Sequence, residues 1–252
     1  MTSASVYSID AGLPFARDLA AGVIKLAASP ERLAGGLILL PSRRAASALQ
    51  AAFLDGGDGV PMLLPRMLPL GDFGNDDDGR LSPYLDDDAG RDLPPPISKI
   101  RRQICLAKLL RHFPLGGQYP SQPQAMRLAE SLGQLIDQLY NADATAEQLR
   151  DLLPDQFSAH WQDILTLLSI LIDRWPAILR QEGFIDVVDR RNQLLRRRAN
   201  QWREEPPDQL IVIAGSTGSI AATRELIGVV ANLPNGHIVL PGLDRHADDQ
   251  WQ

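Results

Sequence analysis

The stretch "LIVIAGSTGSIAATRELI", residues 210–227, decides the fold class. An apolar run over 210–215 leads into a Gly-Ser-Thr-Gly turn, and apolar residues at helical spacing follow, so we expect a helix over 220–232. The next apolar run, "HIVLPGLD" (237–244), supplies another strand. Strand, tight turn, helix and strand in this order are typical of α/β proteins with a parallel sheet.

The N-terminal part shows the same alternation. Short apolar runs predict strands at 6–9, 36–41 and 62–66, and helical patterns lie between them at 15–28 and 43–54. We therefore assign residues 1–70 to the first part of an α/β domain and residues 204–252 to its continuation.

The middle of the chain interrupts this sheet. Residues 71–96 are rich in Asp, Gly and Pro, which predicts a loop or linker, whereas 97–203 has helical periodicity and predicts a mostly α-helical insertion. Pro176 is expected to kink or divide a long helix after Trp175. Two apolar stripes are expected to form a helix-bundle core: Leu128, Leu132, Leu135, Ile136 and Leu139, and then Trp161, Ile164, Leu168, Leu171, Ile172 and Trp175.

Composition narrows the function classes. The chain has 252 residues and a net charge of -6, so it has no general attraction for nucleic acid, and any DNA contact must be local. Its single cysteine, Cys105, excludes a disulfide framework and cysteine-built zinc or iron–sulfur sites within these residues, and favours a reducing cytoplasm. No apolar run reaches the roughly 18 residues that a membrane span needs.

Neither candidate nucleotide loop has the chemistry to bind phosphate as a Walker A motif does. That motif needs Gly-Lys-[Ser/Thr], because the lysine reaches the phosphates and the hydroxyl holds magnesium. The turn after the first strand, with Asp10, Ala11 and Gly12, contains no such sequence, and we interpret it as a degenerate nucleotide loop. The later turn also lacks lysine. The N–H groups of Gly218, Ser219 and Ile220 leave a weak anion site open there, although the favoured interpretation is Ser219 as an ordinary helix N-cap.

Enzymatic use of the Gly215–Ser219 turn is the alternative. A nucleophile elbow reads G-x-S-x-G, whereas this turn places Thr217 at the nucleophile position. A small α/β hydrolase with Thr217, Asp244 and His246, or a nucleotide-dependent enzyme, remains open. The acidic runs 76–78 and 86–88 lack the glutamate that closes a calcium loop, so we expect no metal site there.

Basic clusters are the remaining signal, at 41–49, 98–103 and 189–203. In the last, we expect the apolar residues Val187, Val188, Leu194, Leu195 and Trp202 to face inward. The polar face would then carry Arg190, Arg191, Arg197 and Arg198. These arginines either track a nucleic-acid backbone or are solvated and locally paired.

Six segments in a fixed order resemble the N-terminal part of the AddB family, the second subunit of bacterial AddAB helicase–nucleases, in its alphaproteobacterial form. The segments are "LILLPSRRAASALQAAFL", "ISKIRRQICLAKLL", "HWQDILTLLSILIDRWPAIL", "DVVDRRNQLL", "IAGSTGSIAATRELI" and "IVLPGLD". The resemblance covers nearly the whole chain except the Asp-rich loop.

The resemblance implies an inactivated superfamily 1 helicase segment: a RecA-like domain (1A-like) interrupted by a helical subdomain (1B-like). It implies a scaffold and DNA channel in double-strand break repair, with an AddA-type subunit as heterodimer partner and source of ATP-driven motion. Magnesium for a nuclease, and an iron–sulfur cluster in many members, belong to family regions that this sequence does not match, so we expect no catalysis by this segment. We expect DNA contacts at the ends of two parallel strands, from Ser42, Arg43, Arg44, Ser216, Thr217 and Ser219.

Overall fold

The computed structural model describes residues 5–56, 61–72, 90, 92–114, 117–144, 148 and 170–242, without the side chains of Asp72, Leu171 and Ile172. The chain forms two compact units. One comprises Met1–Asp76 and Leu194–Gln252, and the other comprises Asp77–Gln193. The division falls inside the helix α9 (Val187–Glu204) rather than at the predicted residue 203.

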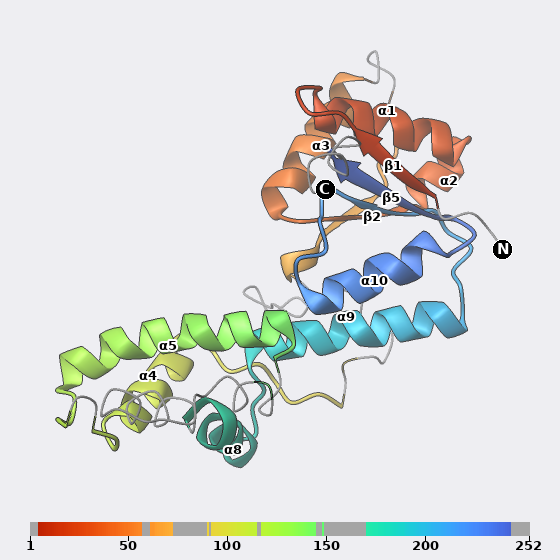
Figure 1. The fold of residues 1–252 in the computed structure, drawn as a ribbon. Coiled ribbons are helices and arrows are strands. Elements are labelled where there is room, and N and C mark those ends of the chain that lie inside the picture. Colours follow the sequence, from red (N-terminus) through yellow and green to blue (C-terminus); the bar gives the residue numbers. More distant parts are fainter. Residues whose placement is uncertain are drawn as a thin grey trace, which may run out of the picture. The chain divides into compact units, whose positions relative to one another are not determined.

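The first unit contains a five-stranded sheet in which every neighbouring pair is parallel (Figure 1). The strand order is β1 (Val6–Ile9), β5 (Gly236–Pro241), β4 (Ile211–Ala214), β2 (Leu37–Leu40), β3 (Arg66–Pro69). All residues of the inner strands β2 and β4 are buried, as expected for parallel strands covered on both faces. The predicted α/β class is confirmed, and the sheet is consistent with a RecA-like fold.

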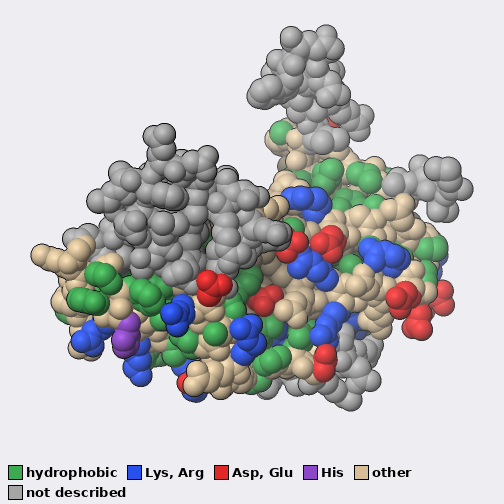
Figure 2. All heavy atoms as spheres, turned by 60° about the horizontal axis from the view of Figure 1, so that its bottom comes forward, with side chains coloured by type: hydrophobic (Ala, Val, Ile, Leu, Met, Phe, Trp, Pro, Cys, Tyr) green, Lys and Arg blue, Asp and Glu red, His purple; other side chains and the backbone are tan. Residues whose placement is uncertain are grey.

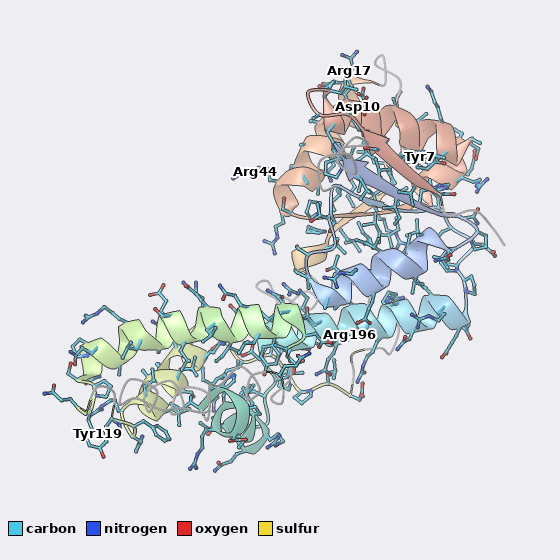
Figure 3. The ribbon with its side chains drawn as sticks, viewed as in Figure 1. Tyr7, Asp10, Arg17, Arg44, Tyr119 and Arg196 are labelled. Carbon is cyan, nitrogen blue, oxygen red and sulfur yellow. The ribbon has the colours of Figure 1, made fainter. Side chains whose placement is uncertain are left out.

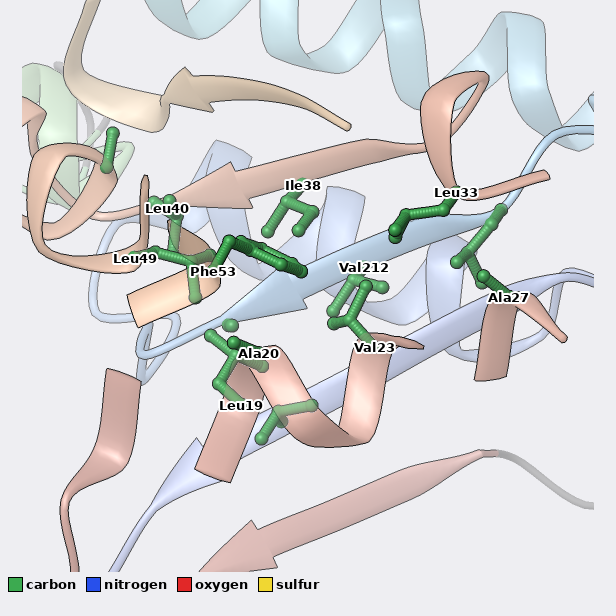
Figure 4. Close-up of a cluster of buried hydrophobic side chains, with 14 residues drawn as sticks. Leu19, Ala20, Val23, Ala27, Leu33, Ile38, Leu40, Leu49, Phe53 and Val212 are labelled. Carbon is green, nitrogen blue, oxygen red and sulfur yellow. The ribbon is translucent and has the colours of Figure 1, made fainter. Parts of the chain in front are cut away.

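Helices cover both faces of the sheet. The helices α1 (Phe15–Ala27), α2 (Pro30–Ala34) and α3 (Arg43–Asp55) lie on one face, and α10 (Ala221–Ala231) lies on the other (Figure 1). The α1/α3 face has a core in which Leu19, Val23 and Phe53 pack against strand residues such as Ile38 and Val212 (Figure 4). This core fixes α1 and α3 against the strand ends where the candidate site lies.

The predicted strand at 62–66 is wrong by about one strand length. The observed strand β3 begins at Arg66, whose N–H donates to Gly36 O at 2.9 Å, and continues in register with β2 to Pro69. Pro65, just before it, has no N–H to donate to a ladder, so pairing starts only after this proline. The other predicted strands and helices of this unit agree with the structure to within a few residues at each end.

The second unit is helical in the part that the structure describes. It contains α4 (Lys99–Leu110), α5 (Gln122–Ala142), a five-residue π-helix η2 (Ile170–Arg174), α8 (Trp175–Glu182) and the first residues of α9. Leu132, Ile136 and Trp175 are buried in its core, but Leu128 and Leu135 are each 39% exposed, contrary to the predicted stripe. Trp161, Ile164 and Leu168 lie outside the described residues. A continuous helical insertion over 97–203 therefore stays a prediction.

Two further expectations for this unit need correction. The helix is divided at Pro176 as predicted, but one residue earlier than expected: the π-helix η2 ends at Arg174, α8 begins at Trp175, and Pro176 lies in the first turn of α8, where a missing N–H removes no helical bond. Within the predicted linker 71–96, Pro96 forms a bridge with Ile185, and Ile185 N donates to Pro95 O at 3.1 Å. The end of that segment is thus part of the helical unit.

Candidate functional site

The candidate site lies where the sheet connections change direction. Strands β2 and β4 are neighbours, but the chain leaves β2 into α3 on one face and leaves β4 into α10 on the other (Figure 1). In open parallel sheets, the crevice between two such diverging loops is the usual ligand site. The predicted DNA-facing residues Ser42–Arg44 and Ser216–Ser219 occupy these two loops.

The loop after β2 starts α3 with two arginines. Ser42 is the N-cap, and its Oγ accepts a hydrogen bond from Ala45 N at 3.2 Å. Arg43 and Arg44 follow in the first turn, where α3 has no acidic residue, and both are exposed. Arg44 projects outward from α3 (Figure 3) and forms no ion pair with any residue that the structure describes.

The loop after β4 is a rigid glycine-based turn. Gly215 and Gly218 have φ values of +72° and +69°, a region that residues with a side chain rarely adopt. The N–H of Gly218 donates to Ser216 Oγ at 3.4 Å, and Arg224 Nε donates to Gly218 O at 3.2 Å. Thr217 is exposed, so its hydroxyl lies on the surface of the turn.

The two loops lie against each other. A Cβ atom added at Gly215 would be 3.6 Å from Pro41 Cδ, the residue before Ser42. The structure thus brings the two predicted groups of polar residues together at one edge of the sheet.

The expected N-cap role of Ser219 is wrong. The N-cap of α10 is Ile220, which makes no side-chain cap hydrogen bond, and the helix begins at Ala221. Because the Gly218 N–H is already bonded to Ser216, the anion site considered for this turn loses one of its proposed donors. Ser219 is exposed beside the turn instead.

The turn after β1 contains no lysine or arginine, and the nearest cation along the chain is the exposed Arg17 in the first turn of α1. Asp10, Ala11 and Gly12 are exposed, Gly12 has a φ of +93°, and Leu13 N donates to Asp10 O at 3.3 Å. Asp10 and Arg17 lie at the start of α1 (Figure 3). The N-cap of this helix, Pro14, makes no side-chain hydrogen bond.

An apolar cavity of about 290 Å³ lies at the strand ends, and Pro41 and Gly215 of the loops after β2 and β4 line part of it. Its walls come from α1, α3 and the ends of β2, β4 and β5, with Phe15, Leu19, Leu40, Pro41, Leu49 and Pro241 among the lining residues. An apolar wall disfavours a polyphosphate, because transfer of charge out of water is unfavourable without paired groups.

The predicted polar face of α9 needs correction. Arg190 and Arg198 are buried, with 8% and 6% exposure, and Arg191 and Arg197 are half-buried. Arg198 lies over the Trp202 ring at 5.8 Å from its centroid. Arg191 donates to Asn192 Oδ1 at 3.1 Å and to Asn141, and burial lowers the pKa of its guanidinium below the ordinary value. These arginines are packed rather than presented to solvent.

Arg190 and Arg198 are buried because the buried surface of α9 is wide. Buried positions include Asn192, Leu195, Arg198, Ala199 and Trp202, and at 3.6 residues per turn they and Arg190 span about half of the helix circumference. A helix enclosed this widely buries polar residues as well as the apolar stripe. Of the residues expected to face inward, Leu195 and Trp202 are buried, whereas Val187, Val188 and Leu194 are half-buried.

The helical unit also contains a buried ion cluster that was not predicted from the sequence. Asp186 is fully buried, and its carboxylate lies 3.0 Å from Arg102 Nε and accepts from Trp175 Nε1 at 3.1 Å and from Val188 N at 3.2 Å. Arg102 also donates to Asp137 at 2.8 Å. Burial raises the pKa of Asp186 above its ordinary value, and the nearby Arg102 acts in the opposite direction.

A sequence signal for this cluster exists. Asp186 directly precedes the apolar pair Val187-Val188 at the start of α9, which is the position of an N-cap residue. The partners Arg102 and Trp175 lie far away in the sequence, so no local pattern could identify them. The network joins the start of α9 to α4 and α8.

The described residues form neither a metal-ligand group nor a membrane-spanning helix. Among those residues, no three His, Cys, Asp or Glu side chains are grouped to hold a metal ion. No described helix combines the length and apolar character needed to cross a membrane. Asp244, His246 and the acidic runs 76–78 and 86–88 lie outside the described residues.

Comparison with known proteins leaves the α/β fold without a family assignment. No protein-family model matches this chain, and no curated protein matches it either.

Proposed function

We propose that the chain is an inactivated, AddB-like helicase segment that acts as scaffold and DNA channel in double-strand break repair. One observation carries the proposal: the two loops at the β2–β4 switch point lie together and present arginine and hydroxyl groups. The turn after β1, where a motor would bind nucleotide phosphates, contains no lysine.

The placement of Arg43 and Arg44 supports a role in binding. Cations in the first turn of a helix oppose the helix dipole, so these two residues disfavour the local fold slightly. Their exposure at the switch point gives them access to an anionic partner. A phosphate backbone is such a partner, and the exposed hydroxyl groups of Thr217 and Ser219 can donate hydrogen bonds to it.

The rest of the proposal follows the family resemblance. The segment would work in a reducing cytoplasm beside an AddA-type subunit that supplies ATP hydrolysis. It would hold no metal or nucleotide of its own. We therefore expect the purified chain to hydrolyse neither ATP nor a generic ester. Turnover abolished by Thr217→Ala or Ser219→Ala would replace the proposal with the enzyme alternative.

The direct test is duplex DNA binding by the double variant Arg43→Ala/Arg44→Ala, measured by fluorescence anisotropy over a salt series. If both arginines neutralise phosphates, the slope of log K against log[salt] decreases in magnitude by about 1.8. Arg32→Ala is the matched control, because Arg32 is an exposed arginine of α2, just before the amino end of β2. Equal slopes for the wild type and the double variant would refute the assignment of the site.

A further inference from the structure

The segment 93–129 is the longest part of the sequence without an acidic residue. It contains six Lys or Arg residues and no Asp or Glu, whereas the other parts contain 19 basic and all 31 acidic residues. It comprises α4, the α4–α5 connection and the start of α5. A protein of net negative charge thus carries a long acid-free segment with six basic residues, which creates a local positive potential.

Most of these cations are available to a ligand. Arg102 is in the buried ion cluster, and Arg101 pairs with Glu182. Lys99, Lys108, Arg111 and Arg127 are exposed and have no ion-pair partner among the residues that the structure describes. Figure 2 shows Lys and Arg side chains dispersed over one face, with Asp and Glu side chains between some of them.

A pocket of about 360 Å³ opens at the start of α5. Tyr119, Arg127 and Gln124 line it together with the apolar side chains of Pro120 and Leu128. Tyr119 is 68% exposed and lies on the outside of the helical unit (Figure 3). The ring of Tyr119 is therefore open to a ligand that enters the pocket.

The polar groups of the pocket suit a nucleotide. Gln124 Oε1 accepts from Ser121 N at 2.9 Å and from Ser121 Oγ at 2.8 Å, which leaves its amide N–H groups for another acceptor. Arg127 supplies a guanidinium that can bind a phosphate. A base can stack on an exposed tyrosine whatever its identity.

We propose that this surface binds single-stranded nucleic acid, with a base stacked on Tyr119, a phosphate on Arg127, and the field of Lys108 and Arg111 attracting the strand. The inference extends the proposed DNA-handling function to the second unit, and it does not require the switch-point loops. An acidic peptide would also be attracted by the cations, but it would gain little from the ring of Tyr119 or from the apolar wall of the pocket.

The test uses the whole chain and a fluorescein-labelled oligo(dT) 20-mer, with binding followed by anisotropy over a salt series. Tyr119→Ala should raise Kd roughly tenfold and leave the salt slope unchanged, because stacking involves no counterion release. Tyr119→Phe keeps the ring and should retain the affinity. Arg127→Ala should reduce the magnitude of the slope by about 0.7, whereas Arg180→Ala, an exposed arginine of α8, should leave it unchanged.

Two results would overturn the inference. One is a Tyr119→Ala variant that binds oligo(dT) as tightly as the wild type. The other is displacement of oligo(dT) by polyglutamate at equal charge, unaffected by Tyr119→Ala, which would assign the surface to an acidic protein. Failure here is distinguishable from failure of the proposed function, because the Arg43/Arg44 variant is measured on duplex DNA. Substitution of Arg43 and Arg44 can leave duplex binding unchanged while substitution of Tyr119 or Arg127 weakens oligo(dT) binding, and the reverse can also occur.

Discussion

The helices α4 and α9 both carry arginine clusters, but the clusters lie in different environments. On α9, Arg190 and Arg198 are buried, and Arg191 is held by the side-chain oxygens of two asparagines. On α4, only Arg102 is buried in ion pairs, whereas Lys108 and the C-cap residue Arg111 are exposed at the end of the helix. The denser cluster is thus the less available one.

The comparison shows that the number of basic residues is a poor guide to a nucleic-acid surface. A buried guanidinium has already exchanged water for protein partners and contributes to stability, whereas an exposed one can still release counterions from a phosphate backbone. Exposure of each cation is the better guide, because the arginine-rich part of α9 at 190–203 is also free of acidic residues and differs from 93–129 in burial.

The largest expected effect on stability comes from the buried ion cluster that contains Arg102 of α4. Asp186→Ala removes the carboxylate that Arg102, Trp175 Nε1 and Val188 N share. It should lower the free energy of unfolding by about 3 kcal/mol, because a broken buried pair leaves a charge and donors without a partner. Urea unfolding followed by circular dichroism measures this. A loss below about 1 kcal/mol would show that water replaces the carboxylate.

A smaller effect is expected from the packed arginine Arg198. Arg198→Ala should destabilise the protein by about 2 kcal/mol, because a long buried side chain loses its packing, including the contact with the Trp202 ring. DNA affinity should not change at any salt concentration. Arg111→Ala is the matched comparison on α4 and should show the reverse: unchanged stability and weaker oligo(dT) binding. If Arg198→Ala alters the salt slope instead, α9 contributes to binding after all.

The exposed ion pair between Arg101 of α4 and Glu182 of α8 should contribute less to stability. Arg101 binds Glu182 with both side chains about half-exposed, and its guanidinium lies 4.5 Å from the Phe184 ring centroid. Arg101→Ala should lower the free energy of unfolding by about 1 kcal/mol or less, since surface ion pairs and exposed cation–π contacts are weak. Thermal unfolding at low and high salt measures it, and the loss should shrink at high salt. A loss equal to that of Asp186→Ala would mean that this pair is not a surface pair.

The α/β unit could be predicted well from the sequence, for a physical reason. The runs "LILL" and "IVIA" are apolar at every position, which is typical of inner parallel strands that are buried on both faces. The turn residues that follow each run mark the end of the strand. Strand β3 was misplaced because its apolar neighbours at 62–65 also look like a strand, and only pairing with β2 decides the register.

The candidate site was predicted in part. Parallel strand order brings the loops after β2 and β4 together, so the residues chosen at the ends of those two strands do meet at one edge. The environment of the arginines on α9 was not predictable, because it depends on residues distant in sequence. The same applies to Asp186, whose partner Arg102 is on another helix.

The last prediction uses Asp186 to separate charge from shape. Asp186→Asn keeps the size of the side chain and an acceptor for Trp175 Nε1, so it should destabilise the protein less than Asp186→Ala does. Because burial raises the pKa of Asp186, the native state binds a proton on this carboxylate more tightly than the unfolded state does. That contribution is complete below the unfolded pKa of about 3.9 and is lost as pH rises through the native pKa. The free energy of unfolding of the wild type should therefore fall relative to that of the variant as pH rises from 4. Urea titrations of both proteins at each pH cancel the other carboxylates, and a difference that grows with pH would mean that the ion pair with Arg102 outweighs the effect of burial.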